Sequence, residues 1–95
     1  MNAAAMPPLN AQRLWARVEA LSRLTLADAP WTRRAFSDLF LQARAWLRDE
    51  MQAAGLAVTL DAAGNLIGRR AGQRADLAPL ATGSHCDTVV GGGRF

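Results

Sequence analysis

The chain has 95 residues, 51% of them apolar and 20% charged, which fits one small globular domain. It contains no apolar run near the roughly 20 residues that span a bilayer, so no transmembrane helix is expected. Its single cysteine, Cys86, excludes an intramolecular disulfide and a zinc site made of several cysteines. A reducing, cytoplasmic location is the simplest expectation.

The net charge of +3 comes from 11 arginines set against 8 acidic residues. The arginines stand singly or in pairs, and acidic residues lie between them. This pattern is typical of solvated helix faces. We therefore expect no nucleic-acid partner and no membrane association.

The first half of the chain predicts two helices after a disordered lead over residues 1–9. One helix, over residues 11–24, begins after the N-cap residue Asn10 and has apolar residues at helical spacing. The other begins after the N-cap residue Ser37 and ends at Gly55, a residue suited to a left-handed helix end. Its apolar stripe predicts a core face formed by Phe40, Ala43, Leu47, Met51 and Ala54.

The second half predicts strands. Leu56–Leu60 and Leu66–Arg70 flank turn-forming residues and are expected to form a hairpin. Leu77–Thr82 is mostly apolar and predicts a buried strand of a sheet covered on both faces. The expected fold class is therefore α/β, the beginning of a domain with two helices, a β-hairpin and a buried strand.

The residues with catalytic or metal-binding chemistry lie in Gly83–Phe95. In an extended chain, His85 and Asp87 project to the same side and Cys86 to the other. The Asp87 carboxylate can accept one ring N–H of His85 and leave the other nitrogen free for a metal. Taken alone, a His-X-Asp sequence is more often a satisfied polar pair at a strand end, so both interpretations stay open.

The residues next to His85 and Asp87 are weaker candidates for a catalytic or ligand-binding role. Cys86 is expected to be a small buried residue, because the chain has no second histidine to activate its thiol. Ser84 has no credible triad for the same reason. Gly91–Gly93 is either a tight turn or a flexible loop, and no Gly-Lys-Ser/Thr follows to make it a phosphate loop.

Gly-Ser-His-Cys-Asp-Thr-Val at residues 83–89, followed by Gly-Gly-Arg-Phe at residues 92–95, closely resembles the metal-binding motif of the hydantoinase/carbamoylase-type amidases. That family holds N-carbamoyl-L-amino-acid hydrolases, β-ureidopropionases and allantoate amidohydrolases, and is related to two-metal aminopeptidases. The resemblance covers the chain from about residue 10. Other segments that look like the family's landmarks are Thr32–Arg33, Ala43–Arg44, Ala54–Leu56 and Asp61–Leu66.

The resemblance implies that His85 is a ligand of one metal and that Asp87 is the catalytic carboxylate that orients the site. It also implies a two-metal aminopeptidase-like catalytic domain, two divalent ions (zinc, manganese, cobalt or nickel) per site, and a homodimer. The implied reaction is hydrolysis of a non-peptide C–N bond in an N-carbamoyl-L-amino acid or a ureide such as allantoate. The motif loop, to which we assign no role, comprises Gly92, Gly93, Arg94 and Phe95.

The same resemblance predicts a fragment. Residues 10–95 look like the N-terminal part of the catalytic domain, and the metal-bridging Asp that follows Gly-Gly-Arg-Phe in the family is absent. The family's Glu pair, later histidines, substrate-binding arginine and lid domain are also absent, so the 95-residue chain is expected to be inactive. Two alternatives stay open: a peptidase or aminoacylase of the same superfamily, and a non-catalytic remnant.

Overall fold

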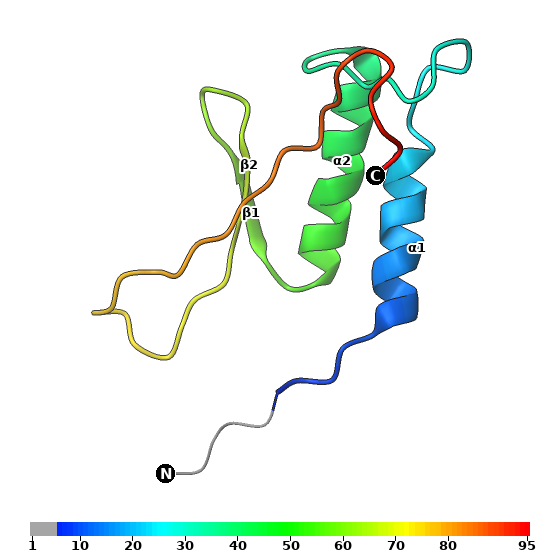
Figure 1. Ribbon diagram of the computed structural model, residues 1–95. Helices are drawn as coiled ribbons and strands as arrows, with labels where there is room; N and C mark the ends of the chain where they lie inside the picture. The colour runs from blue at the N-terminus through cyan, green and yellow to red at the C-terminus, as the bar shows by residue number, and fades with distance from the viewer. Residues whose placement is uncertain (1–5) are drawn as a thin grey trace.

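The computed structural model describes residues 6–95, which form two helices and one two-stranded antiparallel sheet. Figure 1 shows the hairpin on one side of α2 and α1 on the other, with the C-terminal segment returning to the C-terminal end of α1 and the N-terminal end of α2. This content is compatible with the expected α/β class. Neither helix described within residues 6–95 has the length and the apolar content that a membrane span requires. The elements, in chain order, are α1 (Ala11–Ser22), α2 (Asp38–Ala53), β1 (Ala57–Leu60) and β2 (Leu66–Arg69).

Helix α1 begins where the sequence predicted, because the Asn10 side chain accepts a hydrogen bond of 2.9 Å from the Arg13 amide. It ends at Ser22, two residues before the expected end. Beyond Ser22 the backbone tightens, and the Leu24 amide bonds to the carbonyl of Leu21 at 3.1 Å. Of the expected lead over residues 1–9, residues 1–5 lie outside the described residues, and residues 6–9 are in neither helix nor strand.

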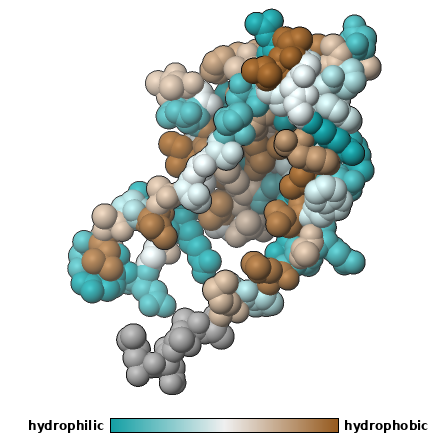
Figure 2. All heavy atoms as spheres, viewed as in Figure 1, coloured by the Kyte–Doolittle hydropathy of each residue, from teal (hydrophilic) through white to brown (hydrophobic). Residues whose placement is uncertain are grey.

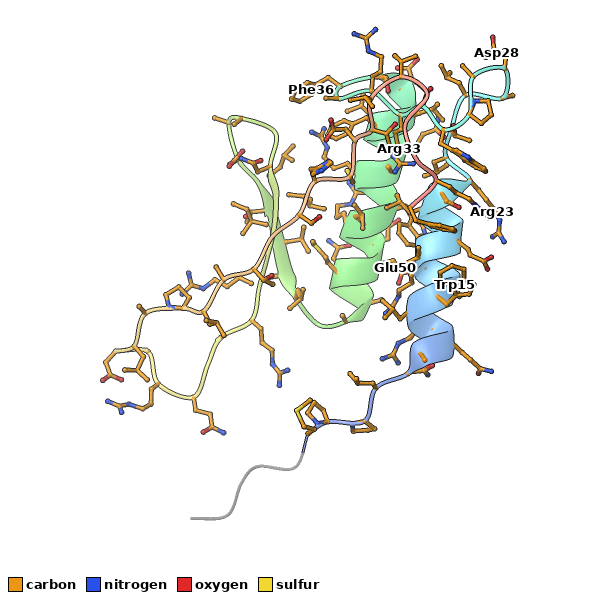
Figure 3. All side chains as sticks on the ribbon, in the orientation of Figure 1. Trp15, Arg23, Asp28, Arg33, Phe36 and Glu50 are labelled. Carbon is orange, nitrogen blue, oxygen red and sulfur yellow. The ribbon has the colours of Figure 1, made fainter. Side chains whose placement is uncertain are left out.

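Helix α2 confirms the second predicted helix. Ser37 Oγ accepts the Phe40 amide at 3.2 Å, and Gly55 takes a positive φ of 86° just beyond the helix end. Ala43, in the middle of the predicted stripe, is fully buried. Ala54, the last member of the stripe, is exposed because it already lies at the C-cap. An ion pair between Arg17 and Glu50 joins α1 to α2, and Figure 3 shows Glu50 on the side of α2 that faces α1.

The hairpin is also confirmed, with Ala57 paired to Arg69 and Leu60 paired to Leu66. Asp61 organises its turn: one carboxylate oxygen accepts the backbone amides of Ala63 and Asn65 at 3.0 and 2.8 Å. A hydrogen bond from the Asn65 side chain, together with these backbone bonds, lowers the pKa of the Asp61 carboxyl.

The hairpin packs on α2 through a close contact at Gly68. A Cβ at this position would lie 2.8 Å from Leu56 Cδ1 and 3.1 Å from Met51 Sδ, so a larger residue would require the end of at least one of these side chains to move. The apolar stripe of α2 is therefore covered by the hairpin on the side that Met51 faces.

The predicted buried strand at Leu77–Thr82 is wrong. This segment has no regular structure, every residue in it is exposed, and Leu80 is 102% exposed. A strand needs a neighbouring backbone to pair with, and β1 and β2 pair only with each other in the part of the chain that the structure describes. Pro79 further removes one amide donor. Figure 2 accordingly shows apolar side chains at several separate places on the surface.

Candidate functional site

The two residues expected to form the metal site do meet. His85 Nδ1 lies 3.2 Å from a carboxylate oxygen of Asp87 and 3.0 Å from the Asp87 carbonyl oxygen. Both oxygens can only accept, so Nδ1 is assigned the proton and Nε2 keeps its lone pair. The His85 side chain is 82% exposed, so little protein covers the ring. Although residues 85–87 are not in a strand, their side chains meet as the extended spacing predicted.

This pair fits one ligand of a metal site but not a whole site. An imidazole whose second nitrogen donates to a carboxylate is the usual arrangement of a metal-binding histidine. Among residues 6–95, no group of three or more His, Cys, Asp and Glu side chains could hold a metal ion. A catalytic zinc site has three protein ligands. The described residues therefore provide a single oriented ligand.

Neither nucleophile candidate next to the histidine is activated. Cys86 is half-buried, and burial raises the pKa of its thiol, while the positive charge of Arg33 opposes that shift. The thiol is therefore protonated at neutral pH and is a poor nucleophile. Ser84 Oγ lies 3.5 Å from the His85 carbonyl oxygen, a weak contact to the backbone rather than to a base.

Arg33 holds the backbone on both sides of Asp87. Its Nε donates to the Cys86 carbonyl at 2.7 Å, and its backbone amide donates to Thr88 Oγ1 at 2.8 Å. The Thr88 amide returns a bond of 2.8 Å to the Arg33 carbonyl. Arg33 is only 7% exposed, and Figure 3 places it between the end of α1 and the C-terminal segment. One buried residue thus fixes the chain on either side of the candidate carboxylate.

The same guanidinium also closes α1. Arg33 Nη1 donates to the carbonyls of Leu21 and Leu24 at 2.8 and 2.7 Å. Carbonyls at a helix C-terminus lack partners within the helix and carry the negative end of its dipole, which favours a cation there. The buried positive charge of Arg33 is therefore satisfied by backbone oxygens.

Sequence reasoning missed this role of Arg33. The bond between Arg33 and Thr88 joins residues 55 apart, and no local pattern reports such a contact. The only signal was that Thr32–Arg33 resembles a family landmark, to which no role was attached. Thr32 is itself buried, and its Oγ1 accepts the Gly91 amide at 2.9 Å.

The glycines of the motif form a tight turn in the described structure. Gly91 has a positive φ of 60°, and the Gly92 amide bonds to the Val89 carbonyl at 3.2 Å. A Cβ on Gly92 would lie 3.2 Å from that same carbonyl oxygen. At these two positions the turn interpretation therefore holds over the flexible loop. Gly93 is less constrained, since its Cβ would lie 3.5 Å from the Phe95 carbonyl oxygen.

Arg94 and Phe95 pack the motif loop back against α1. The Arg94 guanidinium lies 5.1 Å from the centre of the Trp31 ring and 4.9 Å from that of Phe95. The Phe95 ring also packs against Trp15, a residue of α1, with the ring centres 5.1 Å apart and the planes inclined at 45°. Figure 1 shows the C-terminus beside α1 accordingly. In this chain the loop, to which the sequence assigned no role, acts as a packing element.

His85 and Asp87 lie between two open clefts. One, of about 300 Å³, is bounded by α2 and the hairpin turn and includes Arg44, which donates to the Gly64 carbonyl at 3.4 Å. The other, of about 450 Å³, is bounded by Arg33 and the motif loop. The candidate ligand is thus accessible from both sides.

Known proteins similar to this chain include several amidohydrolases. It is 40% identical over 85 residues to the N-carbamoyl-L-amino-acid amidohydrolase of Paenarthrobacter aurescens, an overlap of 90% of this chain and 21% of that protein. It is 38% identical over 88 residues to the N-carbamoyl-L-amino acid amidohydrolase of Geobacillus stearothermophilus, covering 92% of this chain and 22% of that protein. It is 35% identical over 69 residues to the allantoate amidohydrolase of Bacillus subtilis, covering 73% of this chain and 17% of that protein.

These similarities confirm the family resemblance. The chain is a member, by sequence, of the group that contains the N-carbamoyl-L-amino-acid and allantoate amidohydrolases. It spans about a fifth of the length of these relatives. No protein-family profile matches the chain, and no solved structure matches it.

Proposed function

We propose that this chain is part of a metal-dependent amidohydrolase that cleaves a non-peptide C–N bond in N-carbamoyl-L-amino acids or in a ureide such as allantoate. The observation that carries the proposal is the contact of 3.2 Å between His85 Nδ1 and the Asp87 carboxylate, with an exposed ring on the far side. The names of the similar proteins support the reaction class and the kind of substrate.

In this proposal each residue of the pair has one task. His85 binds a divalent ion through Nε2, and Asp87 accepts the Nδ1 proton and so keeps the ring in the tautomer that binding requires. A bound ion of this kind supplies Lewis acidity and a water of lowered pKa. Zinc, manganese, cobalt and nickel are all candidates, because each accepts imidazole nitrogen as a ligand.

The remaining parts of the proposal concern the whole protein. A two-metal centre of the aminopeptidase type needs a bridging carboxylate, further ligands and a general base, and we propose that residues outside these 95 supply them. Substrate-binding residues would lie there as well. We further propose that the whole protein is a cytoplasmic homodimer, and that the 95-residue chain alone does not turn over substrate.

The test uses the whole protein to which this chain belongs, assayed for ammonia release from an N-carbamoyl-L-amino acid and from allantoate, with and without a chelator. We expect activity that the chelator removes, and a loss of about 100-fold or more in His85→Ala, since that change removes a ligand rather than an outer partner. Cys86→Ala is the matched control and should keep most of the activity, because its thiol is protonated and half-buried. Activity that survives in His85→Ala would refute the proposal.

A further inference from the structure

We propose that Arg33 is the positioning residue for His85, a role that rests on the proposed function of His85 as a metal ligand. Arg33 touches neither the histidine ring nor the Asp87 carboxylate in the bonds described above. It acts on the backbone that carries both side chains, through three hydrogen bonds to Cys86 and Thr88.

The bonds from Arg33 flank Asp87 and therefore control the geometry of the His85–Asp87 contact. The contacts of His85 run to the carbonyl and carboxylate of Asp87, so the placement of the ring depends on the backbone at residues 85–87. Arg33 holds the residue before Asp87 and the residue after it. With both neighbours fixed, the carbonyl and the carboxylate of Asp87 keep their directions.

The rest of the surroundings gives the histidine little support. Its side chain is 82% exposed, so packing does not fix the ring. The preceding segment, Leu77–Ser84, is exposed and has no regular structure, so it does not fix the backbone either. The three hydrogen bonds of Arg33 with Cys86 and Thr88, which we call the clamp, are therefore the main connection between His85 and the end of α1.

The chemistry of arginine suits this task and that of lysine does not. The guanidinium reaches the Cys86 carbonyl with Nε, and the Leu21 and Leu24 carbonyls with Nη1. Its planar fork carries five donors in fixed directions, whereas lysine has one nitrogen on a flexible stem. Arg33→Lys would keep the charge and lose the fork, which separates positioning from simple charge neutralisation.

The experiment measures the His85 tautomer and local opening by NMR in the full 95-residue chain, at about pH 8.5, where an ordinary histidine is neutral. The variants are Arg33→Lys and Arg33→Met, with Arg34→Met as the matched control, since Arg34 is the adjacent arginine and is exposed. Nitrogen shifts of the His85 ring report the tautomer, and exchange of the Thr88 amide, bonded to the Arg33 carbonyl at 2.8 Å, reports the clamp.

In the unmodified chain and in Arg34→Met, we expect the Nδ1–H tautomer and a protected Thr88 amide. Both Arg33 variants keep the backbone bonds to Thr88 and lose the charge-assisted bond to the Cys86 carbonyl. Because this segment then opens more often, we expect a mixture of tautomers and a fall in Thr88 protection of about 10- to 100-fold. The Leu56 amide, bonded to Met51 at 3.0 Å, should keep its protection. An unchanged tautomer, or a Leu56 amide that loses protection in step with Thr88, would overturn the positioning role.

A cobalt titration of the same samples separates this inference from the proposed function. Co²⁺ alone should broaden the His85 ring signals first in the unmodified chain, and the affinity should fall about 10- to 100-fold in Arg33→Lys, as losses of outer partners usually do. If Co²⁺ leaves His85 unaffected in the unmodified chain, the metal role fails and the inference fails with it. If Co²⁺ binds His85 with equal affinity in both proteins, the metal role stands and Arg33 has no positioning role.

Discussion

Two segments near the end of the chain, Leu77–Thr82 and Thr88–Phe95, form neither helix nor strand, but they differ in their contacts with the rest of the protein. The first is apolar, was expected to be buried, and is wholly exposed. The second is connected to residues 31–33 by hydrogen bonds and a cation–π contact, and to α1 by the Arg94–Ser22 bond and the Trp15–Phe95 ring contact. An apolar segment needs a neighbour of matching shape, whereas polar side chains can position a loop that has no such neighbour.

The largest effect is expected when the Thr88 hydroxyl, which bonds to the Arg33 amide, is removed. Thr88→Val keeps the shape of the side chain but deletes the hydroxyl that accepts the Arg33 amide at 2.8 Å and donates to the Trp31 carbonyl at 3.1 Å. We expect protection of the Arg33 amide against hydrogen exchange to fall about tenfold or more, because a partly buried donor loses its acceptor. Thr59→Val, at an exposed position of β1, is the control and should leave that amide unchanged. Equal effects of the two substitutions would show that Thr88 is not part of a clamp.

A weaker effect should distinguish the hairpin turn, which is held by a carboxylate, from the end of α2, where the Leu56 amide bonds to a carbonyl. The pKa of Asp61 is lowered below 3.8 in the folded chain, chiefly by its bonds to Asn65. A lowered folded-state pKa means that the stabilisation is present above pH 3.8 and is lost as the pH falls through the lower, folded value. Protection of the Asn65 amide should therefore decrease below about pH 4, earlier than that of the Leu56 amide, whose acceptor is a carbonyl. Parallel loss at both amides would mean that the acid effect is global.

The smallest effect is expected in the segment without partners. Leu80→Ser should change the free energy of unfolding by less than about 0.5 kcal/mol, because Leu80 is 102% exposed and buries nothing in this chain. Chemical denaturation of the two proteins measures it. Leu66→Ser is the comparison, since Leu66 is half-buried in β2 and faces the cleft beside α2. A large destabilisation by Leu80→Ser would show that Leu77–Thr82 does have a partner.

The features that could be predicted from the sequence are those whose contacts are local. Asn10, Ser37 and Asp61 each bond to a backbone amide within four residues, so the local sequence identified both helix starts and the hairpin turn. The His85–Asp87 contact spans two residues and was found for the same reason.

The features that could not be predicted depend on distant residues. The bonds of Arg33 reach 53 and 55 residues along the chain, to Cys86 and Thr88. A single sequence shows an arginine beside another arginine and gives no sign that one is buried and the other exposed. The strand expected at Leu77–Thr82 failed for a related reason, since apolar composition predicts burial only where another element is present to cover it.

The substitution Asp87→Asn tests most directly whether Asp87 orients His85 as a metal ligand. The asparagine keeps the shape of the carboxylate but removes its charge and weakens its hold on Nδ1–H. In the whole protein, we expect the affinity for the divalent ion, measured by competition with a chelator, to fall about 10- to 100-fold. Cys86→Ala should leave the affinity unchanged. A variant Asp87→Asn that binds the ion and turns over substrate like the unmodified protein would contradict the orienting role.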